Sequence, residues 1–250
     1  MELTILGYKG GYPSNGVGTS AYLLESDGYH LLIDAGSGAL LSLEEHLNPL
    51  SLDAVLLSHY HYDHVTDVGS LQQTRKLKKS AAFPKGPPVL PIYAHSQDSI
   101  FSLLTKENVT KAIAYETKSS FSIGPFELTH MKTRHPVICY AFRIVERKTG
   151  KVLVYTADSG YMKELIDFSQ GADLLLADTS FYKGQENNPV HMTSIEVARI
   201  AKNANVLRTI LTHLPEETHD NDLELLRKQA LEEAPNSDFM LAKKGEKIKI

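Results

Sequence analysis

The sequence has a single cysteine, no tryptophan and a small net charge of -4 over 250 residues. With Cys139 alone, no internal disulfide framework or thiolate metal cluster can form, and we expect an inert core residue there. The charge gives no general footprint for nucleic acid, which argues against a nonspecific binder but leaves room for a local basic patch. No apolar run approaches the ~20 residues of a membrane-spanning helix, and the start shows no secretion signal. We therefore expect a cytoplasmic protein with no membrane partner.

Hydrophobic residues make up 42% of the chain, and the length fits one large α/β domain or two small ones. Neither a linker nor a sharp repeat is visible, so we predict one domain over residues 1–250. Apolar runs predict strands at 1–6, 21–25, 29–34, 53–57, 92–94, 126–132, 137–145, 152–156, 173–177, 208–212 and at the 243–250 edge. Helices are expected at 39–47, 64–79, 96–104, 194–203 and 220–233. Two sheets packed face to face and flanked by helices would accommodate these elements.

The most informative stretch is His59-Tyr60-His61-Tyr62-Asp63-His64, which follows the apolar run 53–57. Ligands of an open α/β sheet bind where its strands end. Because alternate residues of an extended segment point the same way, His59 and His61 can hold one metal ion. Asp63 and His64, at the start of the next helix, can reach a second ion. The segment therefore predicts a metal site.

Four further residues of ligand type each end an apolar strand: His135, Asp158, Asp178 and His213. A single such residue is usually a cap or a turn residue, but four of them together with the first cluster are hard to explain as caps. Apart from His191, which is considered below, the remaining histidines do not cluster with other ligand types, and we interpret them as surface or structural residues: His30, His46, His95, His130 and His219.

The six-residue motif, His135, Asp158 and His213 together resemble the metallo-β-lactamase superfamily over nearly the whole chain. The resemblance implies a four-layer αβ/βα sandwich with a dinuclear metal site at one edge. It also implies a ligand set for each ion. The first ion would be held by His59, His61 and His135, the second by Asp63, His64 and His213, and Asp158 would bridge both.

Imidazole and carboxylate ligands suit zinc, with manganese or iron as alternatives. Two such ions about 3.5–4 Å apart can hold a hydroxide that attacks a phosphorus or carbonyl centre, and they neutralise charge on the substrate oxygens. Asp34 resembles the aspartate that supports the site in this family by accepting from a ligand histidine. A helix N-cap is the alternative role for Asp34.

Two features resemble the ribonuclease Z-like branch: the opening 1–14, and the segment 189–198 with its His-x-Thr-x-x-Glu-Val-Ala pattern. In that branch His191 would work with an acidic residue, here Asp178, to place a proton donor near the leaving oxygen. This chain has Leu-Ala-Asp-Thr where the family usually has His-Glu-Ala-Thr, which is a departure from the pattern. The alternative for His191 is a residue at the start of a helix capped by Thr193.

The long arm with which ribonuclease Z clasps transfer RNA has no room here, because only two strands and a turn separate His135 from Asp158. Small phosphodiesters, nucleotides or RNA are the expected substrate classes, with small ones favoured. A basic stretch could contact phosphates, although a solvated helix face and loop is the simpler interpretation: Arg75, Lys76, Lys78, Lys79 and Lys85. The resemblance also implies a possible homodimer.

The leading hypothesis is a dinuclear metal-dependent phosphodiesterase that is ribonuclease Z-like but armless. A second hypothesis keeps the metal site but cleaves an acyl bond, as a lactonase or thioesterase. A third is a non-enzymatic metal-binding regulatory protein, which the complete ligand set disfavours.

Overall fold

The computed structural model describes residues 1–78, 86–217 and 222–250 and divides into two compact units. The first unit comprises Met1–Pro125 and Lys243–Lys249, and the second comprises Phe126–Ala242 with Ile250. Three residues of the sequence interpretation lie outside the described part, namely Lys79, Lys85 and His219. None of the described helices is long and apolar enough to cross a membrane.

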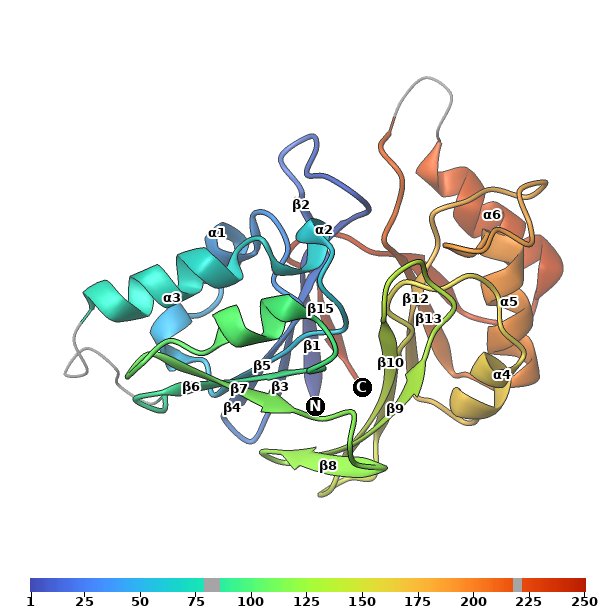
Figure 1. Cartoon of the computed structure of the whole chain (residues 1–250). Helices are drawn as coiled ribbons and strands as arrows, with labels where there is room; N and C mark the ends of the chain where they lie inside the picture. Colours follow the sequence, from blue (N-terminus) through green and yellow to red (C-terminus); the bar gives the residue numbers. More distant parts are fainter. Residues whose placement is uncertain (79–85, 218–221) are drawn as a thin grey trace. The chain divides into compact units, whose positions relative to one another are not determined.

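The first unit is built on a mixed sheet with strand order β15-β1-β3-β4-β5-β6-β7, and β2 pairs with β1 (Figure 1). Its strands are β1 (Glu2–Lys9), β2 (Gly18–Thr19), β3 (Ala21–Ser26), β4 (Tyr29–Ile33), β5 (Ala54–Leu56), β6 (Leu90–Ala94), β7 (Thr110–Ala114) and β15 (Lys247–Lys249), and β8 (Ser120–Ile123) follows β7 in the chain. The β3–β4 hairpin turns at Asp27 and Gly28, both at positive φ, as a two-residue hairpin loop requires. The edge strand expected near the end of the sequence is β15, which pairs antiparallel with β1.

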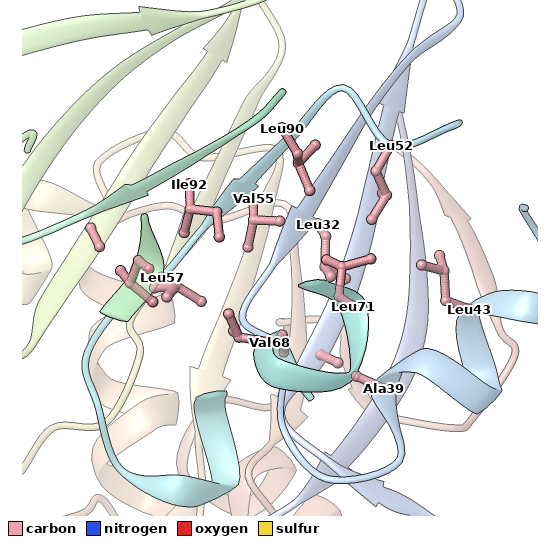
Figure 2. Packing of buried hydrophobic residues seen from close by; sticks show 14 of the residues in the cluster. Leu32, Ala39, Leu43, Leu52, Val55, Leu57, Val68, Leu71, Leu90 and Ile92 are labelled. Atoms are coloured by element: carbon pink, nitrogen blue, oxygen red, sulfur yellow. The ribbon is translucent and has the colours of Figure 1, made fainter. Parts of the chain in front are cut away.

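The helices of the first unit are α1 (Ala39–Glu44), η1 (Pro49–Ser51), α2 (Tyr62–Val65), α3 (Val68–Leu77) and η3 (Ser99–Leu104). Leu43 of α1 and Leu71 of α3 pack with Val55 and Ile92 of the central strands in one buried cluster (Figure 2). This apolar core fixes the sheet edge from which the first histidine cluster projects.

The second unit has the strand order β14-β13-β12-β11-β10-β9. The strands are β9 (Phe126–Lys132), β10 (Tyr140–Glu146), β11 (Val152–Tyr155), β12 (Leu174–Asp178), β13 (Arg208–Thr212) and β14 (Phe239–Leu241), and the helices are α4 (Glu164–Phe168), α5 (Ser194–Asn203) and α6 (Leu223–Glu233). Helices α5 and α6 lie side by side (Figure 1). Because β11, β12 and β13 run parallel, their carboxyl ends meet at one edge of the sheet. Cys139 is buried just before β10, as expected of a core residue.

Helix α1, expected at 39–47, ends at Glu44, and two other helices differ more from the sequence prediction. The helix expected at 64–79 begins at Tyr62 and is interrupted between α2 and α3, because the Asp67 N–H donates to the Ala35 carbonyl (2.9 Å) rather than into a continuous helix. The helix expected from Ser96 is a 3₁₀ helix, η3, capped by Asp98, whose carboxylate accepts from the Ile100 N–H (2.8 Å).

Arg75 is not part of a solvated basic face. Its side chain is buried, and the guanidinium donates to the carbonyls of Leu50 (3.4 Å) and Pro87 (2.5 Å). Burial lowers the pKa of Arg75 to about 10. Arg75 therefore connects α3 to η1 and to the segment before β6, and in the described part of the basic stretch Lys76 and Lys78 are the exposed cations.

Candidate metal centre

In the first unit the predicted cluster gathers just after β5. The ring centroids of His59 and His64 lie 4.1 Å apart, and His59 Nε2 lies 3.2 Å from His61 Nδ1. Asp63 Oδ2 lies 3.5 Å from His64 Nε2. The structure thus brings together all four residues that the motif predicts as ligands in this unit.

Asp34, which follows β4, forms hydrogen bonds with this cluster and with the residue before it. Its carboxylate is buried and accepts three hydrogen bonds at 2.8 Å, from the Ser58 N–H, the Ser58 hydroxyl and His64 Nδ1. Helix α1 begins later, with Gly38 at its N-cap position. The N-cap alternative for Asp34 is therefore wrong, and the residue contacts a candidate ligand as the resemblance implies.

These hydrogen bonds assign the proton positions of two histidines. Because a carboxylate only accepts, His64 Nδ1 carries the proton and Nε2 presents a lone pair. The Ser58 hydroxyl donates its one hydrogen bond to Asp34, so it accepts a hydrogen bond from His59 Nδ1 at 3.0 Å. His59 Nε2 then also presents a lone pair. Ser58 was missed in the sequence, because a serine at the end of a strand has no distinguishing pattern.

The glycine-rich loop between β1 and β2 holds Asp63. The Gly11 N–H donates to Asp63 Oδ2 at 2.9 Å, and Gly11 has φ +76°, a backbone conformation that favours glycine. Gly36, which lies outside this loop, packs against the Asp63 backbone, since a Cβ there would lie 2.0 Å from the Asp63 carbonyl oxygen. The loop lacks a phosphate-binding motif, and its observed role is to orient a candidate ligand.

In the second unit His135, Asp158 and His213 form a corresponding group. Asp158 Oδ2 lies 3.7 Å from His135 Nε2 and 3.4 Å from His213 Nε2. His135 Nδ1 donates to the Val190 carbonyl at 3.1 Å, so its Nε2 presents a lone pair toward Asp158. One carboxylate oxygen thus faces two imidazole nitrogens.

Asp178 and His191 lie beside this group. His191 Nδ1 is 2.7 Å from Asp178 Oδ2, and the Ser159 N–H donates to the same oxygen at 3.1 Å. The Ser180 hydroxyl lies 2.9 Å from Asp178 Oδ1 and 2.9 Å from His213 Nδ1, where it accepts the imidazole proton. Asp158, Asp178, His191 and His213 each offer a ligand atom within 4.8 Å of the others.

His191 is placed by the start of α5. Thr193 is the N-cap and forms a capping box with Glu196, while Phe181 and Thr193 form a parallel bridge. The helix-start features of this segment thus belong to Thr193, and the His191 ring stacks on the His213 ring at a centroid distance of 4.9 Å. The structure therefore pairs His191 with Asp178 despite the departure from the family pattern.

Positive φ angles at non-glycine residues are a further indication of a functional site. Among the described non-glycine residues at positive φ, all are Asn or Asp except Ala157 (+49°) and His213 (+52°). Ala157 precedes Asp158, and the candidate site residue Asp34 has φ +53°. Strained conformations of this kind cost about 1–3 kcal/mol each and concentrate at functional sites.

Comparison with known proteins identifies the family. The profile described as "Beta-lactamase superfamily domain" matches residues 29–214, which is most of the chain. The chain belongs to the β-lactamase superfamily. A Bacillus subtilis (strain 168) member, "Probable metallo-hydrolase YhfI", is 43% identical over 98% of each chain. Its crystal structure, described as a metallo-β-lactamase fold protein, matches with a TM-score of 0.91 at 39% identity, covering 99% of this chain and 98% of that one.

Two solved structures at lower sequence identity match this chain in fold. Human tRNase Z, short form, has a TM-score of 0.76 at 22% identity, covering 100% of this chain and 99% of its own. A diphosphatase from the PhnP family has a TM-score of 0.75 at 19% identity, covering 100% of this chain and 97% of its own. The structure has two mixed sheets with helices, which confirms the predicted α/β fold class of the metallo-β-lactamase type, and the chain stands among the metallo-hydrolases of this superfamily.

The arrangement of donors fits a metal ion. Three contacts place an imidazole lone pair against a carboxylate oxygen: His64 Nε2 with Asp63 (3.5 Å), His135 Nε2 with Asp158 (3.7 Å) and His213 Nε2 with Asp158 (3.4 Å). Two electron-rich atoms repel unless a cation lies near both. Neutral imidazoles in this tautomer, together with carboxylates, are the donors that divalent metal ions bind in proteins. The residues present therefore fit a divalent cation in each unit.

Proposed function

We propose that the protein is a dinuclear metal-dependent phosphodiesterase of the ribonuclease Z-like type without the RNA-binding arm. The observation that carries the proposal is the set of imidazole lone pairs that face carboxylate oxygens in both units. Each of these lone pairs is fixed by a hydrogen bond from the opposite ring nitrogen, an arrangement that orients metal-binding histidines in proteins.

Under this proposal the ligand sets are those that the family resemblance implies. The residues that would hold one ion are His59, His61 and His135, those that would hold the other are Asp63, His64 and His213, and Asp158 would be a ligand of both. Zinc suits these donors best, and manganese or iron are the alternatives. When bound, the two ions would supply an activated water at neutral pH and positive charge opposite the phosphate oxygens.

His191 and Asp178 would handle the proton of the leaving group. Asp178 accepts from His191 Nδ1 at 2.7 Å, which leaves Nε2 to hold a proton for the leaving oxygen. The Ser180 hydroxyl and the Ser159 N–H fix Asp178 in turn. These contacts orient His191 as a general acid requires.

Replacing His191 with alanine should slow phosphodiester turnover roughly 10²–10⁴-fold, the usual contribution of a positioned acid. Bound metal, measured by mass spectrometry on the same samples, should be unchanged. His130→Ala is the matched control, because that ring packs edge-on against Tyr140 in the same unit. If His191→Ala loses metal in proportion to activity, His191 is a ligand and the acid role is wrong.

The short connection between His135 and Asp158 favours small substrates. Strands β10 and β11 form a tight antiparallel hairpin with Val145 opposite Val152, so no arm is inserted there. The phosphoryl chemistry named for tRNase Z and for the PhnP-family diphosphatase supports a phosphorus centre as the target.

Precursor tRNA should therefore be a poor substrate. We expect kcat/KM for 3′ cleavage of a precursor tRNA to be lower than for a small diester such as bis(p-nitrophenyl) phosphate. Both substrates are assayed with the same metal-loaded protein, and a known ribonuclease Z serves as the positive control. Efficient and accurate 3′ cleavage would show that the short β10–β11 hairpin does not limit the substrate.

A further inference from the structure

The two tyrosines of the ligand motif have opposite environments. The Tyr60 side chain is only 7% exposed, its hydroxyl donates to the His95 carbonyl, and its ring lies 4.5 Å from the His95 ring. Burial raises the pKa of Tyr60, so the hydroxyl remains a donor at neutral pH. Tyr60 is therefore a structural residue that anchors the segment.

Tyr62 is 82% exposed and lies between two candidate ligands, His61 and Asp63, at the first position of α2. The two residues that flank Tyr62 are fixed by polar contacts, since His61 Nδ1 contacts His59 Nε2 and Asp63 accepts a hydrogen bond from the Gly11 N–H. The backbone of Tyr62 is thus fixed beside the candidate metal centre while its ring faces solvent.

Tyr12 lies on the glycine-rich loop and is 57% exposed. The loop is ordered by reciprocal hydrogen bonds between Ser14 and Val17 (3.0 and 2.9 Å), and the Tyr12 N–H donates to the Gly10 carbonyl (2.9 Å). The residue before Tyr12 is Gly11, which donates to Asp63, and the residue before Asp63 is Tyr62. A single hydrogen bond therefore ties together the two segments that carry the exposed rings.

We infer that Tyr12 and Tyr62 form an aromatic rim beside the metal centre, and that the preferred phosphodiester carries a nucleobase or similar flat aromatic group. This inference rests on the proposed function and specifies its substrate class. Exposed aromatic rings stack on bases whatever the sequence, because every base has a π-face. The rim therefore selects a flat ring over an alkyl group, with little discrimination between bases.

The test compares two esters with the same leaving group, thymidine 5′-(p-nitrophenyl phosphate) and methyl p-nitrophenyl phosphate. Metal-loaded wild type should favour the nucleoside ester in kcat/KM. Tyr62→Ala and Tyr12→Ala should each lower that preference roughly tenfold, which corresponds to about 1.4 kcal/mol. Tyr62→Phe should retain it, because the ring is kept. Leu103, an apolar residue on η3 that is 70% exposed, provides the control variant Leu103→Ala, which should leave the preference unchanged.

An unchanged preference in both alanine variants would overturn the rim. Failure of the proposed function gives a different result, because the metal-loaded wild type would then cleave neither ester. In that case, calorimetric titration with thymidine 5′-monophosphate would still test whether the aromatic rim binds the nucleobase. Weaker binding by Tyr62→Ala than by Tyr62→Phe would support it, and equal binding would overturn it.

Discussion

Asp158→Asn should reduce phosphodiester hydrolysis by roughly 10³-fold and lower the amount of bound metal. The carboxylate oxygen that faces His135 Nε2 at 3.7 Å and His213 Nε2 at 3.4 Å would become part of a neutral amide. Several kcal/mol of charge stabilisation depend on ions held at such a site, and each 1.4 kcal/mol is a factor of ten in rate. The measurement is kcat/KM for bis(p-nitrophenyl) phosphate together with metal content.

Asp173→Asn is the matched control for Asp158→Asn. Asp173 precedes β12, whereas Asp158 follows β11. The Asp173 carboxylate accepts hydrogen bonds from Lys151 (2.6 Å) and from the Val152 N–H (2.8 Å). This control should keep both metal and activity. Full metal content and wild-type turnover in Asp158→Asn would show that Asp158 is not a metal ligand.

Asp34→Ala should have the largest effect on stability, at least ~3 kcal/mol, because it leaves three buried donors without their acceptor at about 1–3 kcal/mol each. These donors are the Ser58 N–H, the Ser58 hydroxyl and His64 Nδ1. Loss of this support should also weaken metal affinity roughly 10–100-fold, the usual cost of removing a group that orients a ligand. Denaturant unfolding of the metal-free protein and a metal titration at permissive temperature measure the two effects separately.

Asp53→Ala provides the comparison for Asp34→Ala. Asp53 lies just before β5, and its carboxylate accepts from the His30 N–H at 2.8 Å. We expect this variant to lose less stability and to bind metal normally. Normal metal affinity in Asp34→Ala, with only stability reduced, would show that Asp34 is structural and does not tune the candidate ligands.

Local patterns were sufficient for several elements. The strands at Phe126–Lys132 and Arg208–Thr212 and the helix at Ser194–Asn203 have the predicted bounds, because each is a single apolar or amphipathic run with clear ends. The elements that were not predicted are the short strands β2, β7, β8 and β14, the 3₁₀ helix η1 and the short helix α4. Each spans five residues or fewer, too few for a periodic pattern to emerge.

Contacts between distant residues account for most of what the sequence did not predict. The interruption between α2 and α3 depends on a hydrogen bond from Asp67 to Ala35, which no local pattern encodes. Ser58 and Ser180 fix the protons of His59 and His213, yet a serine in a turn is common in any sequence. The ligand-type residues themselves were predicted because histidine and aspartate at successive strand ends are rare outside such sites.

The most direct test is hydrolysis of bis(p-nitrophenyl) phosphate beside a lactone and a thioester, with metal quantified on the same protein. We predict phosphodiester turnover at about two metal ions per chain, lost on chelation and restored by adding zinc or manganese. Lactone or thioester cleavage without phosphodiester turnover would contradict the phosphodiesterase and indicate an acyl hydrolase. Bound metal with no turnover of any of the three would indicate a metal-binding protein that is not a hydrolase of these bonds.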